Sequence, residues 1–199
     1  MMVKICGITN PEDAQAAVDA GATALGFNFW RHSPRYISPT AASLITEILP
    51  GSTLKVGVFV DETPEVIAKI ALQAHLDVAQ LHGASECLAV RRWRACLVRE
   101  TLEIDCPPDL EAEAFLLDTA SPKLRGGTGL TFDWSLAKAA AVKIRKNIVI
   151  AGGLDADNVQ TAIAEAQPWG VDSCSRLESS PGRKDHLKMQ MFIRAALAA

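Results

Sequence analysis

The sequence lacks the marks of a membrane, nucleic-acid-binding or metal-binding protein. No apolar run reaches the ~18 residues that a membrane-spanning helix requires, and no signal-peptide core stands before the first apolar segment. Lys and Arg number 20 against 23 Asp and Glu, so the net charge of -3 gives no basic surface for a nucleic acid. The five cysteines have no C-x-x-C spacing and the four histidines no ligand spacing, so neither a metal site nor a disulfide framework is expected. We therefore expect a reduced, cytoplasmic protein without membrane or nucleic-acid partners.

What is present is an ordinary globular chain with a regular alternation. The 199 residues, 49% hydrophobic, suit a single domain spanning residues 1–199. Short β-branched segments alternate with Ala-rich helical segments, and their strands end about 24 residues apart, which favours a parallel sheet with helical crossovers. The predicted strands are Val3–Cys6, Ala24–Phe29, Lys55–Val60, Val78–His82, Ala95–Val98, Ala114–Asp118, Ile148–Ala151 and Val171–Cys174.

Eight such strand–helix units predict an α/β protein of the (β/α)8 TIM-barrel class, although a doubly wound open sheet would show the same alternation. Several predicted helices begin with a capping residue, in three cases followed by proline. These caps are Asn10, Ser38 and Thr63, with Asp133 and Asp155 as further candidates. The segment Cys106-Pro107-Pro108 interrupts the fifth unit, so we expect a shortened or missing fifth helix.

Polar side chains recur at the predicted strand ends. Because side chains alternate along a strand, Lys4 and Cys6 share the face that would point into a barrel, while Val3 and Ile5 would face the helices. Active sites of α/β proteins lie at the carboxyl ends of strands, so polar groups there are candidates for chemistry. The same parity groups Gln80 with His82, Leu116 with Asp118, and Gly170 with Asp172 and Cys174.

Each of these candidates also has a purely structural interpretation. Cys6 alone is more often a small buried apolar group than a reactive thiol. His82 could be a core or turn histidine, and Asp118 a helix cap. Asp172 could form a buried ion pair with Lys4, since buried charges normally come paired.

Two loops carry the pattern of a phosphate site. Gly152 and Gly153 lie between a strand and a helix start, where bare backbone N–H groups can approach an anion closely. Cys174 and Ser175 follow the next strand, and in barrels the loops after strands 7 and 8 frequently bind phosphate. The alternative is a tight turn that binds nothing.

Two basic loops complete the set of candidates. Arg35 follows the second strand and is either an anion-recognition residue or a solvated surface residue. Residues 125–129 form a third glycine-rich segment, with the character of a mobile flap with a cationic tip.

Short motifs from residue 3 to the last helix point to one family. They are Lys4–Thr9, Ser33–Ser38, Val56–Val60, Gln80–Gly83, Leu116–Thr119, Gly126–Gly129 with Phe132–Trp134, Ala151–Leu154 and Pro181–Asp185. Together, and in this order, they resemble phosphoribosylanthranilate isomerase. The resemblance implies a (β/α)8 barrel and a cofactor-independent aldose–ketose isomerase. Its reaction, the third step of tryptophan biosynthesis, converts N-(5′-phosphoribosyl)anthranilate into 1-(2-carboxyphenylamino)-1-deoxyribulose 5-phosphate.

The resemblance also implies roles for individual residues. It makes Asp118 the general acid that opens the ribose ring and Cys6 the general base that removes the C2′ proton. It implies that Arg35 holds the anthranilate end, and that His82 and Asp172 line the pocket, Asp172 near the ribose hydroxyls. The expected partner is a small phosphorylated substrate, with no cofactor and no metal, and the protein is expected to be a monofunctional monomer or homodimer.

The sequence departs from the family in the loop after the eighth strand. Where the family reads Ser-Ser-Gly-Val-Glu, this chain reads Cys174-Ser175-Arg176-Leu177-Glu178. Arg176 would be strained if the glycine position needed a positive φ, so the turn could differ, or the guanidinium could itself bind phosphate. Asn28 also stands where an apolar residue is more usual.

The sequence is also to be weighed against three rival functions. A bifunctional isomerase that also acts on the histidine-pathway aminoaldose would be expected to carry an acid–base aspartate where Cys6 stands. A catalytically silent phosphate-binding barrel would have no need of Cys6 and Asp118 together. A metal-dependent sugar-phosphate epimerase is disfavoured by the histidine spacing.

Overall fold

The structure is a computed structural model of the whole chain. It describes residues 1–98, 104–105, 109, 111–119, 134, 137 and 145–199. The glycine-rich segment 125–129 and the predicted cap Asp133 lie outside the described residues. Within the described part of the chain, no helix is long and apolar enough to cross a membrane.

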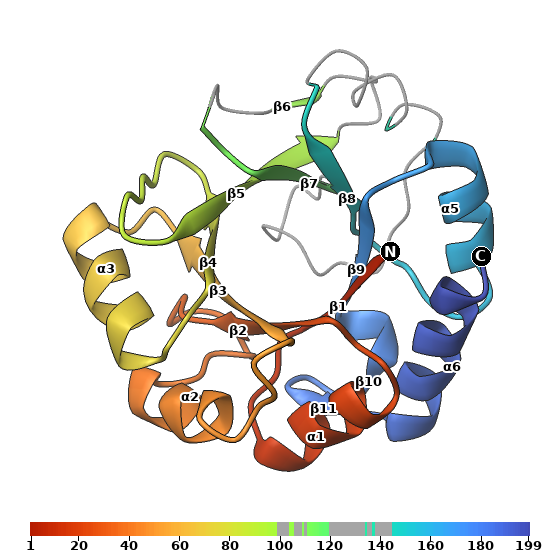
Figure 1. Cartoon of the computed structure of the whole chain (residues 1–199), viewed down its shortest axis with the longest axis horizontal. Coiled ribbons are helices and arrows are strands. Elements are labelled where there is room, and N and C mark those ends of the chain that lie inside the picture. Colours follow the sequence, from red (N-terminus) through yellow and green to blue (C-terminus); the bar gives the residue numbers. More distant parts are fainter. Residues whose placement is uncertain (99–103, 106–108, 110, 120–133, 135–136, 138–144) are drawn as a thin grey trace.

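Eight parallel strands close into a barrel, as Figure 1 shows. Each of these eight strands pairs with the next one, and the last pairs with the first, with Lys4 opposite Asp172. The barrel is therefore closed and the doubly wound alternative is excluded. The strands are β1 (Met2–Cys6), β2 (Ala24–Asn28), β3 (Leu54–Val60), β4 (Val78–His82), β5 (Arg91–Val98), β7 (Ala114–Thr119), β8 (Asn147–Ile150) and β9 (Gly170–Ser173).

Helices surround the barrel along most of its circumference (Figure 1). Asn10, Ser38 and Thr63 each accept a hydrogen bond from a first-turn backbone N–H, which confirms three predicted caps. The cap predicted at Asp155 is wrong, because its side chain accepts the N–H of Asp157 in a turn and the helix starts later. The helices are α1 (Pro11–Asp19), α2 (Pro39–Thr46), α3 (Pro64–Gln73), α5 (Val159–Ala166) and α6 (His186–Leu197).

Two crossovers depart from the strand–helix repeat. Residues 83–90, all of them described, connect β4 to β5 without a helix, whereas the sequence predicted a full fourth unit. The reason is that β5 begins at Arg91 and not near Ala95, which leaves too short a connection for a helical crossover. After β5, the described residues hold the short antiparallel strand β6 (Ile104–Asp105) and no helix, in line with the expected loss of the fifth helix.

Among the described residues, two arginines on the outer face of β5 bind the loop that precedes the strand. Arg92 donates to Asp109 at 2.9 Å and to the carbonyl oxygen of Cys87 at 2.9 Å. Arg94 donates to the carbonyl oxygen of Ser85 at 2.8 Å and to Asp109 at 3.0 Å. These guanidinium groups supply donors to loop carbonyls that a helix would have satisfied internally.

The core divides into two layers, as strand alternation predicts. Val3 and Ile5 belong to the outer layer between the strands and the helices, while Lys4 is fully buried inside the barrel. The inner layer comprises Met2, Ala24, Val56, Val78, Trp93, Ala114, Leu116, Val149 and Ala151. Cys96 on β5 is disulfide-bonded, so the expectation of a chain without disulfides is wrong at this position.

Three short elements follow β9. They are the 3-10 helix η1 (Ser175–Leu177) and the strands β10 (Glu178–Ser180) and β11 (Arg183–Lys184), which pair as an antiparallel ribbon. They place charged side chains beside the carboxyl ends of β1 and β9.

Candidate active site

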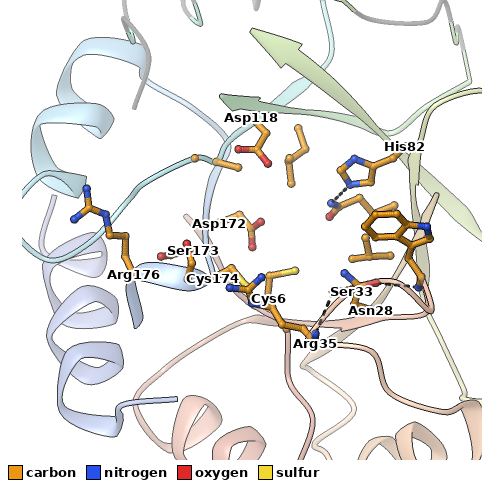
Figure 2. Close-up of a pocket in the computed structure, with 18 of the residues that line it drawn as sticks. Cys6, Asn28, Ser33, Arg35, His82, Asp118, Asp172, Ser173, Cys174 and Arg176 are labelled. Carbon is orange, nitrogen blue, oxygen red and sulfur yellow. Dashed lines mark hydrogen bonds between the residues drawn. The ribbon is translucent and has the colours of Figure 1, made fainter. Parts of the chain in front are cut away.

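A cavity opens at the carboxyl ends of the strands, and every residue that the sequence predicted for the site lines it. Figure 2 shows the side chains of this cavity converging from several strands. The predicted residues lining it are Cys6, Arg35, His82, Asp118, Gly152, Gly153, Asp172, Cys174 and Ser175. Closure of the barrel brings them together, since they come from all parts of the described chain.

The floor of the cavity contains a buried ion pair. Lys4 Nζ lies 2.9 Å from Asp172 Oδ1, so the structural interpretation of Asp172 is correct, although Asp172 also lines the cavity. Burial raises the pKa of Asp172 to about 7, against the opposing effect of Lys4. Burial alone would lower the pKa of Lys4, but attraction to Asp172 and Cys6 outweighs it and raises that pKa.

Cys6 ends β1 directly above this pair. A hydrogen bond from Cys174 does most to lower the pKa of the Cys6 thiol, and the charges of Lys4 and Lys184 add to it. Together they outweigh burial and hold the pKa well below its usual range. The neighbouring strand makes room for the sulfur, because a Cβ on Gly26 would lie 2.8 Å from Cys6 Sγ. The site therefore favours a thiolate at Cys6.

Asp118 comes from β7, which β9 and β8 separate from β1 in the barrel. It lies near the end of β7, is 7% exposed and lines the cavity. In the view of Figure 2, the carboxyl of Asp172 lies between Asp118 and Cys6. The site thus presents a carboxyl group and an acidic thiol to the same space, which suits proton transfer to one atom of a bound molecule and from another.

The side chains that β2 and β4 contribute to the cavity wall are polar, and not all of their polar atoms have a hydrogen-bond partner among the described residues. Gln80 Nε2 lies 3.1 Å from His82 Nε2, and Gln80 Oε1 is buried with no hydrogen-bond partner among the described residues. Asn28 Oδ1 accepts the backbone N–H of Trp30 at 2.9 Å, so this departure from the family serves the local loop. Sequence reasoning missed Trp30, whose position just past the end of β2 was the available signal.

Arg35 is held by a carboxylate that the sequence did not pair with it. Its Nε and Nη2 donate to the two oxygens of Glu178, both at 2.8 Å. Lys184, fully buried at its side chain, donates to Glu178 at 3.1 Å and to the Cys174 carbonyl oxygen at 3.1 Å. Burial alone would raise the pKa of Glu178, but Arg35 and Lys184 outweigh it and lower that pKa. The hydrogen bonds that Arg35 donates to Glu178 are likewise the main cause of the raised pKa of Arg35.

The two glycine- and serine-bearing loops meet at one side of the cavity. Gly152 and Gly153 have φ angles of 86° and 65°, the left-handed region in which a side chain is costly. Ser173 Oγ donates to the Leu154 carbonyl oxygen and so ties the loop after β8 to β9. This arrangement leaves bare backbone facing the cavity next to Ser175.

Arg176 lines the same side without the strain that its sequence position suggested. It lies in η1 and outside the positive-φ region, so an arginine fits the turn. Its side chain is half exposed, and Nη1 lies 3.9 Å from Asp155 Oδ2 and not against Glu178.

The protein has the fold and the site of a TIM-barrel enzyme, because its closed (β/α)8 barrel brings acid and thiol groups together at the carboxyl ends of the strands. Comparison with known proteins gives the family. Residues 3–195 match the family model described as N-(5'phosphoribosyl)anthranilate (PRA) isomerase. The N-(5'-phosphoribosyl)anthranilate isomerase of Solibacter usitatus (strain Ellin6076) is 48% identical over 203 residues, covering 100% of this chain and 98% of that protein.

Solved structures of similar proteins indicate the same family. The crystal structure of phosphoribosyl anthranilate isomerase from Thermotoga maritima is 39% identical, with a TM-score of 0.88 and full coverage of both chains. A crystal structure of phosphoribosyl anthranilate isomerase in complex with reduced 1-(o-carboxyphenylamino)-1-deoxyribulose 5-phosphate is 35% identical with a TM-score of 0.82, again over both full chains. The chain belongs to the phosphoribosylanthranilate isomerase family.

Proposed function

We propose that this chain carries out the reaction of its family with Cys6 as general base and Asp118 as general acid. The reaction is the isomerisation of N-(5′-phosphoribosyl)anthranilate in tryptophan biosynthesis. The observation that carries the proposal is that Cys6, with its lowered pKa, and the buried carboxyl of Asp118 line one cavity.

The chemistry divides between the two residues. Asp118 protonates the ribose ring oxygen, and the ring opens to an iminium ion. The Cys6 thiolate then removes the C2′ proton, which gives an enolamine that tautomerises to the ketone. A base is most effective when its pKa lies near the operating pH, so a thiol with an ordinary pKa of ~8.5 benefits from being lowered.

The remaining residues bind the substrate. Gly152, Gly153 and the backbone of Cys174 and Ser175 cradle the phosphate, because bare amides and positive φ angles suit an anion. Asp172 lies next to Cys6 along the cavity floor, where the ribose hydroxyls would sit.

In this proposal Arg35 and His82 bind the anthranilate end. The guanidinium of Arg35 is already oriented by Glu178, and His82 lies beside Gln80, whose buried Oε1 can accept a donor from the substrate. A thiol at position 6, where an aspartate would be expected, argues against the bifunctional rival that also serves the histidine pathway.

We further propose that the enzyme is a single domain over residues 1–199, works in the cytoplasm and needs neither cofactor nor metal. Its partner is then the small phosphorylated substrate alone, with no nucleic acid and no membrane. Turnover that is unchanged after dialysis against a chelator supports metal independence. Sedimentation distinguishes the monomer from the homodimer.

The test is the loss of substrate fluorescence with purified protein and with Asp118→Asn. The substitution keeps the shape but removes the transferable proton, so kcat should fall by about 10²-fold or more with KM little changed. Unfolding in urea provides the control for stability. A variant that unfolds easily but whose folded fraction turns over normally would make Asp118 a structural residue.

A further inference from the structure

We propose that Lys184 is a positioning residue for phosphate binding: its buried ammonium group holds the carbonyl oxygen of Cys174 and so turns the N–H of Ser175 toward the substrate phosphate. The inference rests on the proposed function, in which the backbone of Cys174 and Ser175 binds that phosphate. Lys184 acts through this backbone, because it does not itself line the cavity.

The ammonium group of Lys184 is fully engaged by the loop after β9. Nζ donates to the carbonyl oxygen of Cys174 at 3.1 Å and to Glu178 Oε1 at 3.1 Å, and it lies 3.8 Å from Cys174 Sγ. An ammonium group has three N–H donors, so these three contacts account for all of them. The side chain of Lys184 has no exposed surface, so it supports the loop from inside the protein.

The contact with the carbonyl oxygen sets the direction of the next N–H. The oxygen of Cys174 accepts from Lys184 Nζ and, at 3.2 Å, from the N–H of Leu177. In a trans peptide unit the carbonyl oxygen and the following N–H point in opposite directions. The oxygen points toward Lys184, outside the cavity, whereas Cys174 and Ser175 line the cavity. The N–H of Ser175 therefore faces the cavity.

The backbone that carries Lys184 is itself anchored. Lys184 lies on β11 and pairs with Glu178 on β10. Its N–H donates to Asp13 Oδ2 on α1 at 2.9 Å, and Asp13 is buried. The N–H of Asp185 donates to the carbonyl oxygen of Leu177 at 2.8 Å, which ties the same segment to η1. The ammonium group thus extends from a fixed point, and its contact with Cys174 is a packed feature of the site.

The structural alternative is that Lys184 only balances the charge of Glu178. That carboxylate already accepts two hydrogen bonds from Arg35, both at 2.8 Å, and one from the N–H of Gly182 at 3.3 Å. Its charge is therefore paired without Lys184. Among the described side chains, Lys184 is the one that donates to the carbonyl oxygen of Cys174, so its loss should be felt first at that peptide.

The experiment observes the N–H of Ser175 directly. Cys174-Ser175 is the only place in the sequence where serine follows cysteine, so cell-free labelling with carbonyl-¹³C cysteine and ¹⁵N serine selects one NMR signal. Inorganic phosphate is titrated into the full-length parent, Lys184→Met and Arg183→Met. Methionine keeps most of the side-chain length but has no donor. Arg183→Met removes an exposed cation from the same strand and is the matched control.

The signal of Ser175 should shift in the parent as phosphate binds. In Lys184→Met the shift at saturation should fall below about half of the parent value, and the Kd for phosphate should rise about 10-fold or more, because the N–H can turn away. Arg183→Met should keep both parent values. A full shift at saturation in Lys184→Met would overturn the proposal, since Lys184 would then act by charge alone. A parent signal that phosphate does not move would overturn it without any variant.

Turnover provides the second readout. Lys184→Met should raise KM by about 10-fold while kcat stays within about twofold, because the groups that transfer protons are untouched. Lys184→Gln, which keeps an N–H donor for the carbonyl oxygen, should recover most of the lost affinity. Urea unfolding shows that the compared proteins are folded. A loss of kcat with KM unchanged in Lys184→Met would overturn the role in phosphate binding.

The two proposals fail separately. A parent protein without isomerase activity, in which Lys184→Met still weakens the phosphate response of Ser175, would overturn the proposed function alone. An unchanged phosphate response in Lys184→Met, with an active parent, would overturn only the role of Lys184.

Discussion

At the scale of single residues, the site depends on charges that are buried together. Lys4 has a fully buried side chain and contacts Asp172, and it also stabilises the Cys6 thiolate next to it. The strand alternation of the sequence predicted that Lys4, Cys6 and Asp172 would meet, because side-chain parity needs only local information. The bond between Arg35 and Glu178 was not predicted, because 143 residues separate the partners and no local pattern connects them.

The Lys4→Met variant tests this buried pair. Loss of the cation leaves Asp172 buried without its partner, and we expect the free energy of unfolding to fall by about 3–5 kcal/mol at pH 8. The loss should be smaller at pH 5. The pKa of Asp172 is raised to about 7 in the folded protein, so at pH 5 its carboxyl is protonated and leaves no unpaired charge in the variant. The contribution of this proton to stability is present below the unfolded pKa of Asp172 and is lost as pH rises through 7.

Urea unfolding at the two pH values measures the effect. Lys188→Met removes an exposed lysine paired at 3.8 Å on α6 and is the matched control, expected to change stability by less than about 0.5 kcal/mol. Equal destabilisation by Lys4→Met at pH 5 and pH 8 would mean that Asp172 does not titrate in this range.

At the scale of elements, the sequence predicted seven of the eight barrel strands closely, but it placed the start of β5 near Ala95 and not at Arg91, and so predicted the crossover before it wrongly. The caps at Asn10, Ser38 and Thr63 were predictable because capping is a local hydrogen bond. The connection of residues 83–90 was not, since its backbone is satisfied by Arg92 and Arg94 from the following strand. A segment whose backbone carbonyls are bonded by donors from another strand shows no periodic hydrophobic pattern in its own sequence.

Asp109→Asn tests whether these arginines replace a helix. The substitution removes the charge that pairs with both guanidinium groups, and stability should fall by about 1.5–3 kcal/mol in urea unfolding at pH 7. Burial alone would raise the pKa of Asp109, but the arginines outweigh it and lower that pKa, so the wild-type contribution should disappear as pH falls through the lowered value.

Glu111→Gln provides the comparison within the same cluster. Its carboxylate lies 3.2 Å from Arg92 but is 77% exposed, so its loss should cost less than about 1 kcal/mol. Destabilisation by Asp109→Asn no greater than that of Glu111→Gln would show that the buried arginines do not hold this connection.

At the scale of the whole molecule, barrel closure makes the site. Cys6 ends β1 and Asp118 lies near the end of β7, with β8 and β9 between them in the sheet. In an open sheet these strand ends would lie along a line, whereas the closed barrel turns both side chains into one cavity. The number and order of units predicted the barrel, but only the register of β9 on β1 shows that it closes.

Cys6→Ser shows whether the thiolate of Cys6 removes the substrate proton. Serine keeps the size but has a pKa far above the working pH, so kcat should fall by about 10²-fold or more while KM changes little. Cys87→Ser controls for the loss of a buried thiol elsewhere. Turnover of phosphoribosylanthranilate by Cys6→Ser at a rate near that of the parent protein would show that Cys6 is not the base.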